Sequence, residues 1–189
     1  MNRQDIDVVI DFWFGEPGSD LRGKGRKVWW VVDEAFDTAV QDTLGSLYEK
    51  AAAGVFDGWA EDPKGCVALV LLLDQAPRNL FRGHARAFAT DEKARGVTRE
   101  ALAHRLDLEV PEFMRVFLYM PLEHSEDLTD QELCVELMRA LGNQTYVDFA
   151  VRHRDIIARF GRFPHRNDVL GRRSTEEEIE FLKQPGSSF

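Results

Sequence analysis

Three segments of this 189-residue chain carry polar side chains where the apolar pattern predicts burial: residues 74–83, 120–132 and 159–173. The second and third segments are electrically opposite. Residues 121–136 contain six acids and no Lys or Arg, whereas residues 152–173 contain seven Arg and two acids. An arginine side chain presents a planar fork of N–H donors that binds a carboxylate or a phosphate through two hydrogen bonds. The Arg-rich segment is therefore the first place to look for a site that binds an anion.

These segments admit two interpretations, and the sequence leaves both open. In the first, arginines and carboxylates pair with one another and form a partly buried network that fixes how the helices pack. In the second, one or two arginines line a pocket for an anionic small molecule, for example one that bears a phosphate, because a buried charge without a partner is costly to retain. The candidate ligand-binding residues are Asp74, Gln75, Arg78, Asn79, Arg82, Arg162, Arg166, Asn167 and Arg172.

Three residues are the candidates for proton exchange if the chain is an enzyme, which the sequence does not establish. His124 and Glu126 lie in a stretch that is expected to be a loop, and loops on a rigid scaffold often carry function. His165 lies in a proline-containing stretch with the same property. His153, in contrast, lies between Phe149 and Ile157 on the apolar face of a predicted helix, which favours a buried core histidine over a ligand contact.

Motifs for familiar cofactors and metals are absent from the sequence. It has no Gly-rich phosphate loop, no dinucleotide fingerprint, no nucleophile elbow and no histidine pair at the spacing of a helical metal site. We therefore expect neither a cofactor nor a metal. Cys66 and Cys134 are isolated and are expected to be buried free thiols. Ser125 directly follows His124, but adjacent residues rarely point at one another, so the two do not indicate a catalytic pair.

The overall charge excludes some classes of partner. The chain has 33 Asp and Glu against 24 Lys and Arg, a formal net charge of −9. This balance argues against a nucleic-acid-binding protein and against binding to an anionic membrane surface. The longest apolar run, residues 66–73, is far shorter than the roughly 20 residues of a membrane span. The first residues do not read as a signal peptide, so a cytoplasmic location is expected.

Apolar residues recur at helical spacing along almost the whole chain, which predicts an all-α fold in one domain, residues 1–189, of about eight helices. The run 66–73 is also compatible with a buried strand, but no other segment alternates like a strand, so a central helix is preferred. Helices are predicted over about residues 6–14, 32–53, 63–76, 90–105, 111–120, 129–141, 145–160 and 175–184.

Local signals place several helix ends. Asp62 and Pro63 are typical of an N-cap followed by proline at the first helical position. Pro77 disfavours helical geometry at the residue before it, so the central helix is expected to kink or end there. The patterns Thr129-x-x-Glu132 and Thr175-x-x-Glu178 predict capping boxes that begin two later helices.

The three polar segments contain the sequences DQAPRNLFRG, FLYMPLEHSEDLTDQE and RFGRFPHRNDVLGRRSTEEEIEFL. Their order and length resemble the hallmark blocks of the bacterial domain-of-unknown-function 924 family, and the likeness extends from Trp13 to Leu182. Ala76 departs from the family pattern, which usually has a bulky residue before this proline. The resemblance implies an all-α superhelix of antiparallel helical hairpins like that of tetratricopeptide proteins. It implies no activity, but it makes the polar segments the family's signature positions.

A second function class competes with the anion pocket. Paired helices can present a concave surface to a protein or peptide, and the polar centre would then be purely structural. In that case an exposed patch lined by aromatic side chains such as Trp29 and Trp30 is expected. The sequence indicates neither the identity of such a partner nor the oligomeric state.

Overall fold

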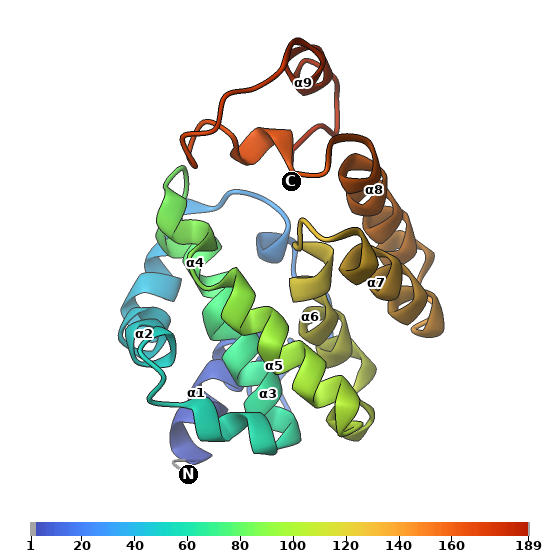
Figure 1. The fold of residues 1–189 in the computed structure, drawn as a ribbon. Coiled ribbons are helices and arrows are strands. Elements are labelled where there is room, and N and C mark those ends of the chain that lie inside the picture. The colour runs from blue at the N-terminus through green and yellow to red at the C-terminus, as the bar shows by residue number, and fades with distance from the viewer. Residues whose placement is uncertain (1–2, 189) are drawn as a thin grey trace. The chain divides into compact units, whose positions relative to one another are not determined.

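The computed structural model describes residues 3–188, which Figure 1 shows as a succession of helices. Those residues contain no strand, so the predicted all-α class is confirmed. They fold into two compact units. Unit 1 consists of the described residues up to 82 together with 86–121, and unit 2 consists of 83–85 together with those from 122 onward. The single domain over residues 1–189 and the tetratricopeptide-like arrangement stay predictions.

Unit 1 is organised around a short apolar helix that is buried along almost its whole length. Its helices are α1 (Arg3–Phe14), α2 (Glu34–Ala52), α3 (Pro63–Val70), α4 (Ala76–Leu80), α5 (Asp91–Ala103) and α6 (Glu112–Glu123), whose last two residues belong to unit 2. The buried helix is α3, against which α1 and α5 pack. The Gly65 N–H donates to the Asp62 carboxylate at 2.8 Å, so the predicted cap is confirmed.

The helical geometry changes before Pro77 rather than at it. A π-helical turn, Leu71–Gln75, separates α3 from α4, and Ala76 keeps helical dihedral angles, with φ −54° and ψ −45°. Helical geometry therefore continues through Ala76, so the predicted end at Pro77 is wrong, whereas the predicted kink stays a prediction. Proline has no N–H to bond the carbonyl four residues back, which here belongs to Leu73. The Thr90 hydroxyl donates to that carbonyl at 2.5 Å instead, so the buried acceptor is satisfied.

Two helix starts differ from the predicted ones because an aspartate acts as the N-cap. Asp33 caps α2, so Val32, which was predicted to begin this helix, precedes it and is 71% exposed. Helix α7 (Leu128–Ala140) begins after Asp127, whose carboxylate accepts a hydrogen bond of 2.8 Å from the Thr129 N–H. The capping box predicted at Thr129 is therefore wrong. Asp127 lies two residues before Thr129, and its carboxylate binds a free N–H group of the first helical turn, so the helix begins before the predicted cap.

Unit 2 begins with a helical hairpin. Helix α7 packs against α8 (Gln144–Phe160), and because only residues 141–143 join them, the two run antiparallel (Figure 1). His153 lies on the buried side of α8. Phe149, which the sequence placed on the same apolar face, is 45% exposed, so that part of the predicted face is wrong.

The chain after α8 turns back and packs against the end of this helix. Gly161 adopts a left-handed conformation (φ +68°) that ends the helix and turns the chain back. Phe163 then packs with α8 side chains in a small apolar core, and the short helix η6 (Pro164–Arg166) follows. Helix α9 (Glu176–Leu182) begins with the predicted capping box, which is confirmed.

Cys66 and Cys134 are both free and buried, as predicted. Burial raises the pKa of the Cys66 thiol to about 12, which keeps it protonated and unreactive at neutral pH. No helix within residues 3–188 is long and apolar enough to cross a membrane.

Candidate functional site

The first polar segment is held by acids of its own unit. Arg78 makes a bidentate pair with Asp91, with N–O distances of 2.9 and 3.0 Å, and its guanidinium also lies 3.3 Å from the buried Asp74. Arg82 makes a second bidentate pair with Asp37, at 2.7 and 2.8 Å. The Asn79 amide donates to the same aspartate at 2.7 Å. Each guanidinium in this segment therefore has a carboxylate against it.

The electrostatics of unit 1 reflect this pairing. Burial acts to raise the pKa of Asp37, but the hydrogen bonds from Arg82 and Asn79 outweigh it and lower that pKa. Burial acts to lower the pKa of Arg78, and the charges of Asp74 and Asp91 more than compensate. Both pairs therefore stay charged, as the first interpretation of the sequence requires.

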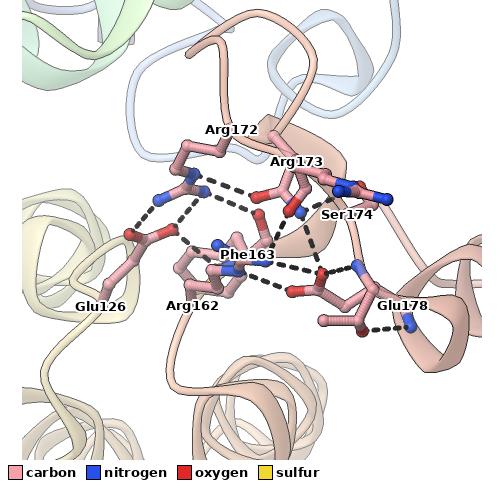
Figure 2. A network of polar contacts seen from close by, with 9 residues as sticks. Glu126, Arg162, Phe163, Arg172, Arg173, Ser174 and Glu178 are labelled. Atoms are coloured by element: carbon pink, nitrogen blue, oxygen red, sulfur yellow. Dashed lines mark hydrogen bonds and ion pairs between the residues drawn. The ribbon is translucent and has the colours of Figure 1, made fainter.

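In unit 2 the second and third polar segments come together (Figure 2). Arg172 makes a bidentate pair with Glu126, with N–O distances of 2.6 and 3.0 Å. The Phe163 N–H donates to the same carboxylate at 2.8 Å. Burial acts to raise the pKa of Glu126, but the hydrogen bonds from Arg172 and Phe163 lower it. The acid-rich turn after α6 is thereby tied to the chain after α8.

A second pair lies beside it in Figure 2. Arg162 binds Glu178 through two hydrogen bonds of 2.6 and 2.7 Å, and the pair lowers the pKa of this carboxyl to about 2. Asn167 joins the two pairs, because its amide N–H donates to Glu178 at 3.3 Å and its carbonyl accepts from Arg172 at 3.0 Å. Asn167 and Glu178 are almost completely buried. The two pairs, together with Asn167, therefore fix the backbone on both sides of η6.

The same part of unit 2 contains three histidines and one arginine that lie close together. We call them the histidine cluster, and its members are His124, His153, His165 and Arg166. The rings of His124 and His153 lie 6.1 Å apart. The Arg166 guanidinium lies over the Phe163 ring at 4.4 Å and donates to the His124 carbonyl at 3.1 Å. The His153 ring meets the same phenyl ring edge-on at 5.7 Å, and the His165 ring lies 5.5 Å from it. Three side chains that carry or can take positive charge, those of His153, His165 and Arg166, therefore contact one aromatic ring, and His124 lies beside His153.

His153 is the most deeply buried histidine of this cluster, at 5% exposure. Its Nδ1 lies 2.9 Å from the Phe149 carbonyl, to which it donates, and 3.3 Å from the Glu123 carboxylate. Burial lowers the pKa of His153 to about 3, and the positive charges of His124, Arg166 and His165 act in the same direction. The imidazole is therefore neutral at physiological pH.

The turn between α6 and α7 is fixed by buried polar groups. The Gln131 amide donates to the Glu123 carbonyl at 2.5 Å and to the Ser125 carbonyl at 2.7 Å. The Ser125 hydroxyl donates to Asp130 at 2.7 Å. This hydroxyl is thus engaged with an acid of α7 and makes a structural contact. The bonds set the position of His124, which the same turn carries.

The structure therefore places the candidate residues in two groups. Asp74, Gln75, Arg78, Asn79 and Arg82 belong to unit 1, whereas Glu126, Arg162, Arg166, Asn167 and Arg172 belong to unit 2 with His124 and His165. His153, whose ring lies 6.1 Å from that of His124, and Glu123, which lies 3.3 Å from His153, were not among the candidates. The position of Glu123 directly before His124 could have pointed to Glu123.

Two further features of the described part of the chain bear on metal and ligand binding. Among residues 3–188, no group of three or more His, Cys, Asp or Glu side chains is arranged to hold a metal ion. An open depression of about 570 Å³ lies on α1 and is lined by Gln4, Asp7, Val8, Asp11, Phe12 and Glu16. Its acidic lining does not suit an anion, and it contains none of the candidate residues.

Comparisons place this all-α architecture and these polar segments in a known family. The family model described as "Bacterial protein of unknown function (DUF924)" matches residues 9–186, and the chain belongs to this family. A solved structure of a protein of unknown function, ATU0120 from Agrobacterium tumefaciens, is similar to it, with 40% sequence identity and a TM-score of 0.88. The match covers 97% of this chain and 99% of that one. No curated protein matches the chain.

Proposed function

We propose that unit 2 binds an anionic small molecule at the histidine cluster, with a phosphate-bearing metabolite as the preferred class. The observation that carries this proposal is the gathering of His124, His165 and Arg166 around His153. Where His124 and His165 are protonated, their charges and that of Arg166 repel one another, and an anion placed among them reduces that repulsion. A cluster of this kind is a functional-site candidate on physical grounds.

The ion pairs support this proposal by dividing the arginines into two roles. Arg162 and Arg172 are bound to Glu178 and Glu126, which are structural contacts that hold the backbone around η6. Arg166, which η6 carries between them, has its guanidinium over Phe163 within the histidine cluster. We therefore assign anion binding to Arg166 with His124 and His165, and positioning to the two paired arginines and Asn167.

The pairs of unit 1 have a positioning role as well. Arg78 and Arg82 are neutralised by Asp91 and Asp37, so a ligand anion would have to displace a carboxylate to reach either guanidinium. Such an exchange replaces one strong charge-assisted contact by another and yields little net binding. The first interpretation of the sequence thus fits unit 1, and the second fits unit 2.

Thermal unfolding with added anions tests this function. Inorganic phosphate and sulfate should raise the melting temperature, and an anion at 100 times its dissociation constant adds about 2.7 kcal/mol if it binds only the folded protein. His165→Gln should weaken this stabilisation at least fivefold in apparent affinity. His104→Gln is the matched control, because His104 is an exposed histidine of α5's C-terminal end in unit 1 and should leave the response unchanged.

A second candidate function rests on a different surface. Trp30 and Val32 of unit 1 are 50% and 71% exposed, and Val31 between them is exposed as well. Trp30 is held in place by stacking on Phe117. Lys24 lies in the same loop and has no ion-pair partner within residues 3–188. These features favour a protein partner with an acidic, apolar segment.

A synthetic peptide of alternating Glu and Leu is a suitable probe for the second function. Binding that is seen as a change in tryptophan fluorescence, and is lost in Trp30→Ala, would support it. If neither phosphate nor sulfate raises the melting temperature while this peptide does, the interaction function replaces the anion function.

A further inference from the structure

Two consecutive segments of unit 1 carry opposite charge. Residues 4–20 contain five acids and no Lys or Arg, whereas residues 21–32 contain two Lys, two Arg and no acid. One ion pair joins the two segments, because the Arg22 guanidinium binds the Asp11 carboxylate at 2.8 Å. In a chain with a net charge of −9, this reversal sets a basic stretch directly after an acidic one. We call residues 21–32 the basic loop.

The basic loop combines exposed apolar surface with unpaired positive charge. The side chains of Leu21, Trp30 and Val32 are all at least half exposed. Lys24 and Lys27 are exposed as well, and neither has an ion-pair partner among residues 3–188. Exposed apolar side chains bordered by charge are typical of a surface that contacts another protein.

The depression on α1 has the opposite charge and an apolar part of its own. Val8, which is 39% exposed, and the half-buried Phe12 both line this space of about 570 Å³. Asp7 and Glu16 line it too, and in the described part of the chain neither carboxylate has an ion-pair partner. We call it the acidic depression. Its lining suits a surface that offers both positive charge and apolar atoms.

The two surfaces are complementary, yet they do not satisfy each other within one molecule. Both lysines of the basic loop and both open carboxylates of the acidic depression stay unpaired among residues 3–188. Arg26 holds the loop in place, because it donates to the Phe12 and Trp13 carbonyls at 3.0 Å each. Trp30 is held by stacking on Phe117. Because both surfaces are already ordered, little conformational entropy is lost when they meet on different molecules.

From this complementarity we infer that unit 1 binds a second copy of the chain, with the basic loop of each copy on the acidic depression of the other. The inference rests on the second candidate function and identifies its acidic, apolar partner. Both surfaces lie within residues 4–32 and are joined by the pair of Arg22 with Asp11, so a two-fold axis lets two copies exchange both contacts and close a dimer. The apolar side chains supply most of the affinity, whereas the exposed charges steer the encounter and fix its register.

Sedimentation of the full chain at several concentrations measures this association. A monomer–dimer equilibrium is expected, in which the mass rises from 21.6 kDa toward twice that value with concentration. Because the charges that meet are exposed, raising the salt from about 0.05 to about 0.5 M should weaken dimerisation at least about threefold.

Two exposed valines of unit 1 provide a matched pair of variants. Val32, in the basic loop, is 71% exposed, and Val55, outside it, is 67% exposed. Val32→Ser should raise the dissociation constant of the dimer at least about fivefold, because it removes apolar contact area. Val55→Ser makes the same change on a surface that has no part in the contact, and it should leave the dissociation constant unchanged.

Two charge-reversed chains test the pairing itself. One carries Lys24→Glu with Lys27→Glu, so its loop and its depression are both acidic. The other carries Asp7→Lys with Glu16→Lys, so both of its surfaces are basic. Each chain alone should be monomeric, because like charges now face each other across both contacts. An equal mixture should form a heterodimer, because both contacts are then again between opposite charges.

The outcomes separate this inference from the function on which it rests. A chain that stays monomeric while the Glu–Leu peptide binds at Trp30 would overturn the inference and leave the second candidate function with another protein as partner. If the chain is monomeric and the peptide does not bind, both fail. Association that is unchanged in Val32→Ser and in both charge-reversed chains would overturn the inference, because another surface would then form the dimer. Assemblies that grow beyond a dimer would overturn it as well, because the contacts would then not close about a two-fold axis.

Discussion

Each unit contains two bidentate arginine–carboxylate pairs, yet the two regions differ in what surrounds them. In unit 1, Arg78 and Arg82 meet Asp91 and Asp37, and Asp74 lies against Arg78 as well. In unit 2 the same chain segments also carry the histidine cluster, in which His124, His165 and Arg166 act electrostatically on the neutral ring of His153. Similar residues thus stabilise structure in one region and hold a candidate site in the other. The difference shows that arginine content alone does not locate a site.

Loss of the Glu178 carboxylate should have the largest effect on stability. Glu178→Gln leaves the Arg162 guanidinium and the Asn167 amide against a neutral group, and of the variants considered we expect it to lower the free energy of unfolding most. Urea unfolding measures it. Glu177→Gln is the matched control at the next residue, because its pair with Arg159 is exposed and should contribute less than about 0.5 kcal/mol. Equal losses in the two variants would contradict the account.

Asp91→Asn breaks the equivalent contact in unit 1. It removes the charge that binds Arg78 and should lower the free energy of unfolding by about 2 kcal/mol. Affinity for sulfate, measured by calorimetry at a temperature where the variant is folded, should stay within twofold of the unchanged protein. A loss of sulfate binding would show that unit 1 takes part in the anion site. It would contradict the view that the ion pairs of unit 1 are structural and that unit 2 binds the anion.

The pH dependence of stability measures the contribution of the buried His153. His153 has a pKa of about 3 in the folded protein against an ordinary value of 6.5. Between these values the unfolded chain binds the proton and the folded chain does not. Stability is therefore lost as the pH falls from 6.5 toward 3, by up to about 1.4 kcal/mol per pH unit. His153→Asn should flatten this part of the curve, as measured by urea unfolding at several pH values.

Glu178 provides the control for that experiment. Its pKa is lowered from 4.5 to about 2, so the stability it contributes is present above pH 4.5 and is lost only as the pH falls toward 2. Glu178→Gln should therefore leave the pH dependence between 6.5 and 4.5 unchanged. If Glu178→Gln also flattened the pH dependence of stability between pH 6.5 and 4.5, the loss of stability in that range could not be assigned to His153.

Local features of the fold could be predicted from the sequence. The cap at Asp62 and the capping box at Thr175 depend on residues within one helical turn, and both are present. The helix starts at Glu34 and Leu128 were misplaced because aspartates that also fit an N-cap lay nearby. The course of the chain at Pro77 depends on Thr90, whose hydroxyl comes from a segment that local patterns do not connect to it.

The candidate site could be predicted only in part. The charge reversal between residues 121–136 and 152–173 pointed to the two segments that meet in unit 2. It could not show that Arg172 binds Glu126, 46 residues away, while Arg166 lies over an aromatic ring. His153 was interpreted as a core histidine, and it is buried. Its proximity to Glu123 and His124 depends on how α8 packs at the end of α6, which no local pattern encodes.

Imidazole NMR during a sulfate titration tests the central claim most directly. The chain has five histidines, and each gives its own ring signals, so the response can be assigned residue by residue. The account predicts that the signals of His124, His153 and His165 shift together as sulfate is added. The signals of the exposed His104 in unit 1 should not move. Unchanged signals from the three clustered rings, or an equal shift at His104, would contradict an anion site in the histidine cluster.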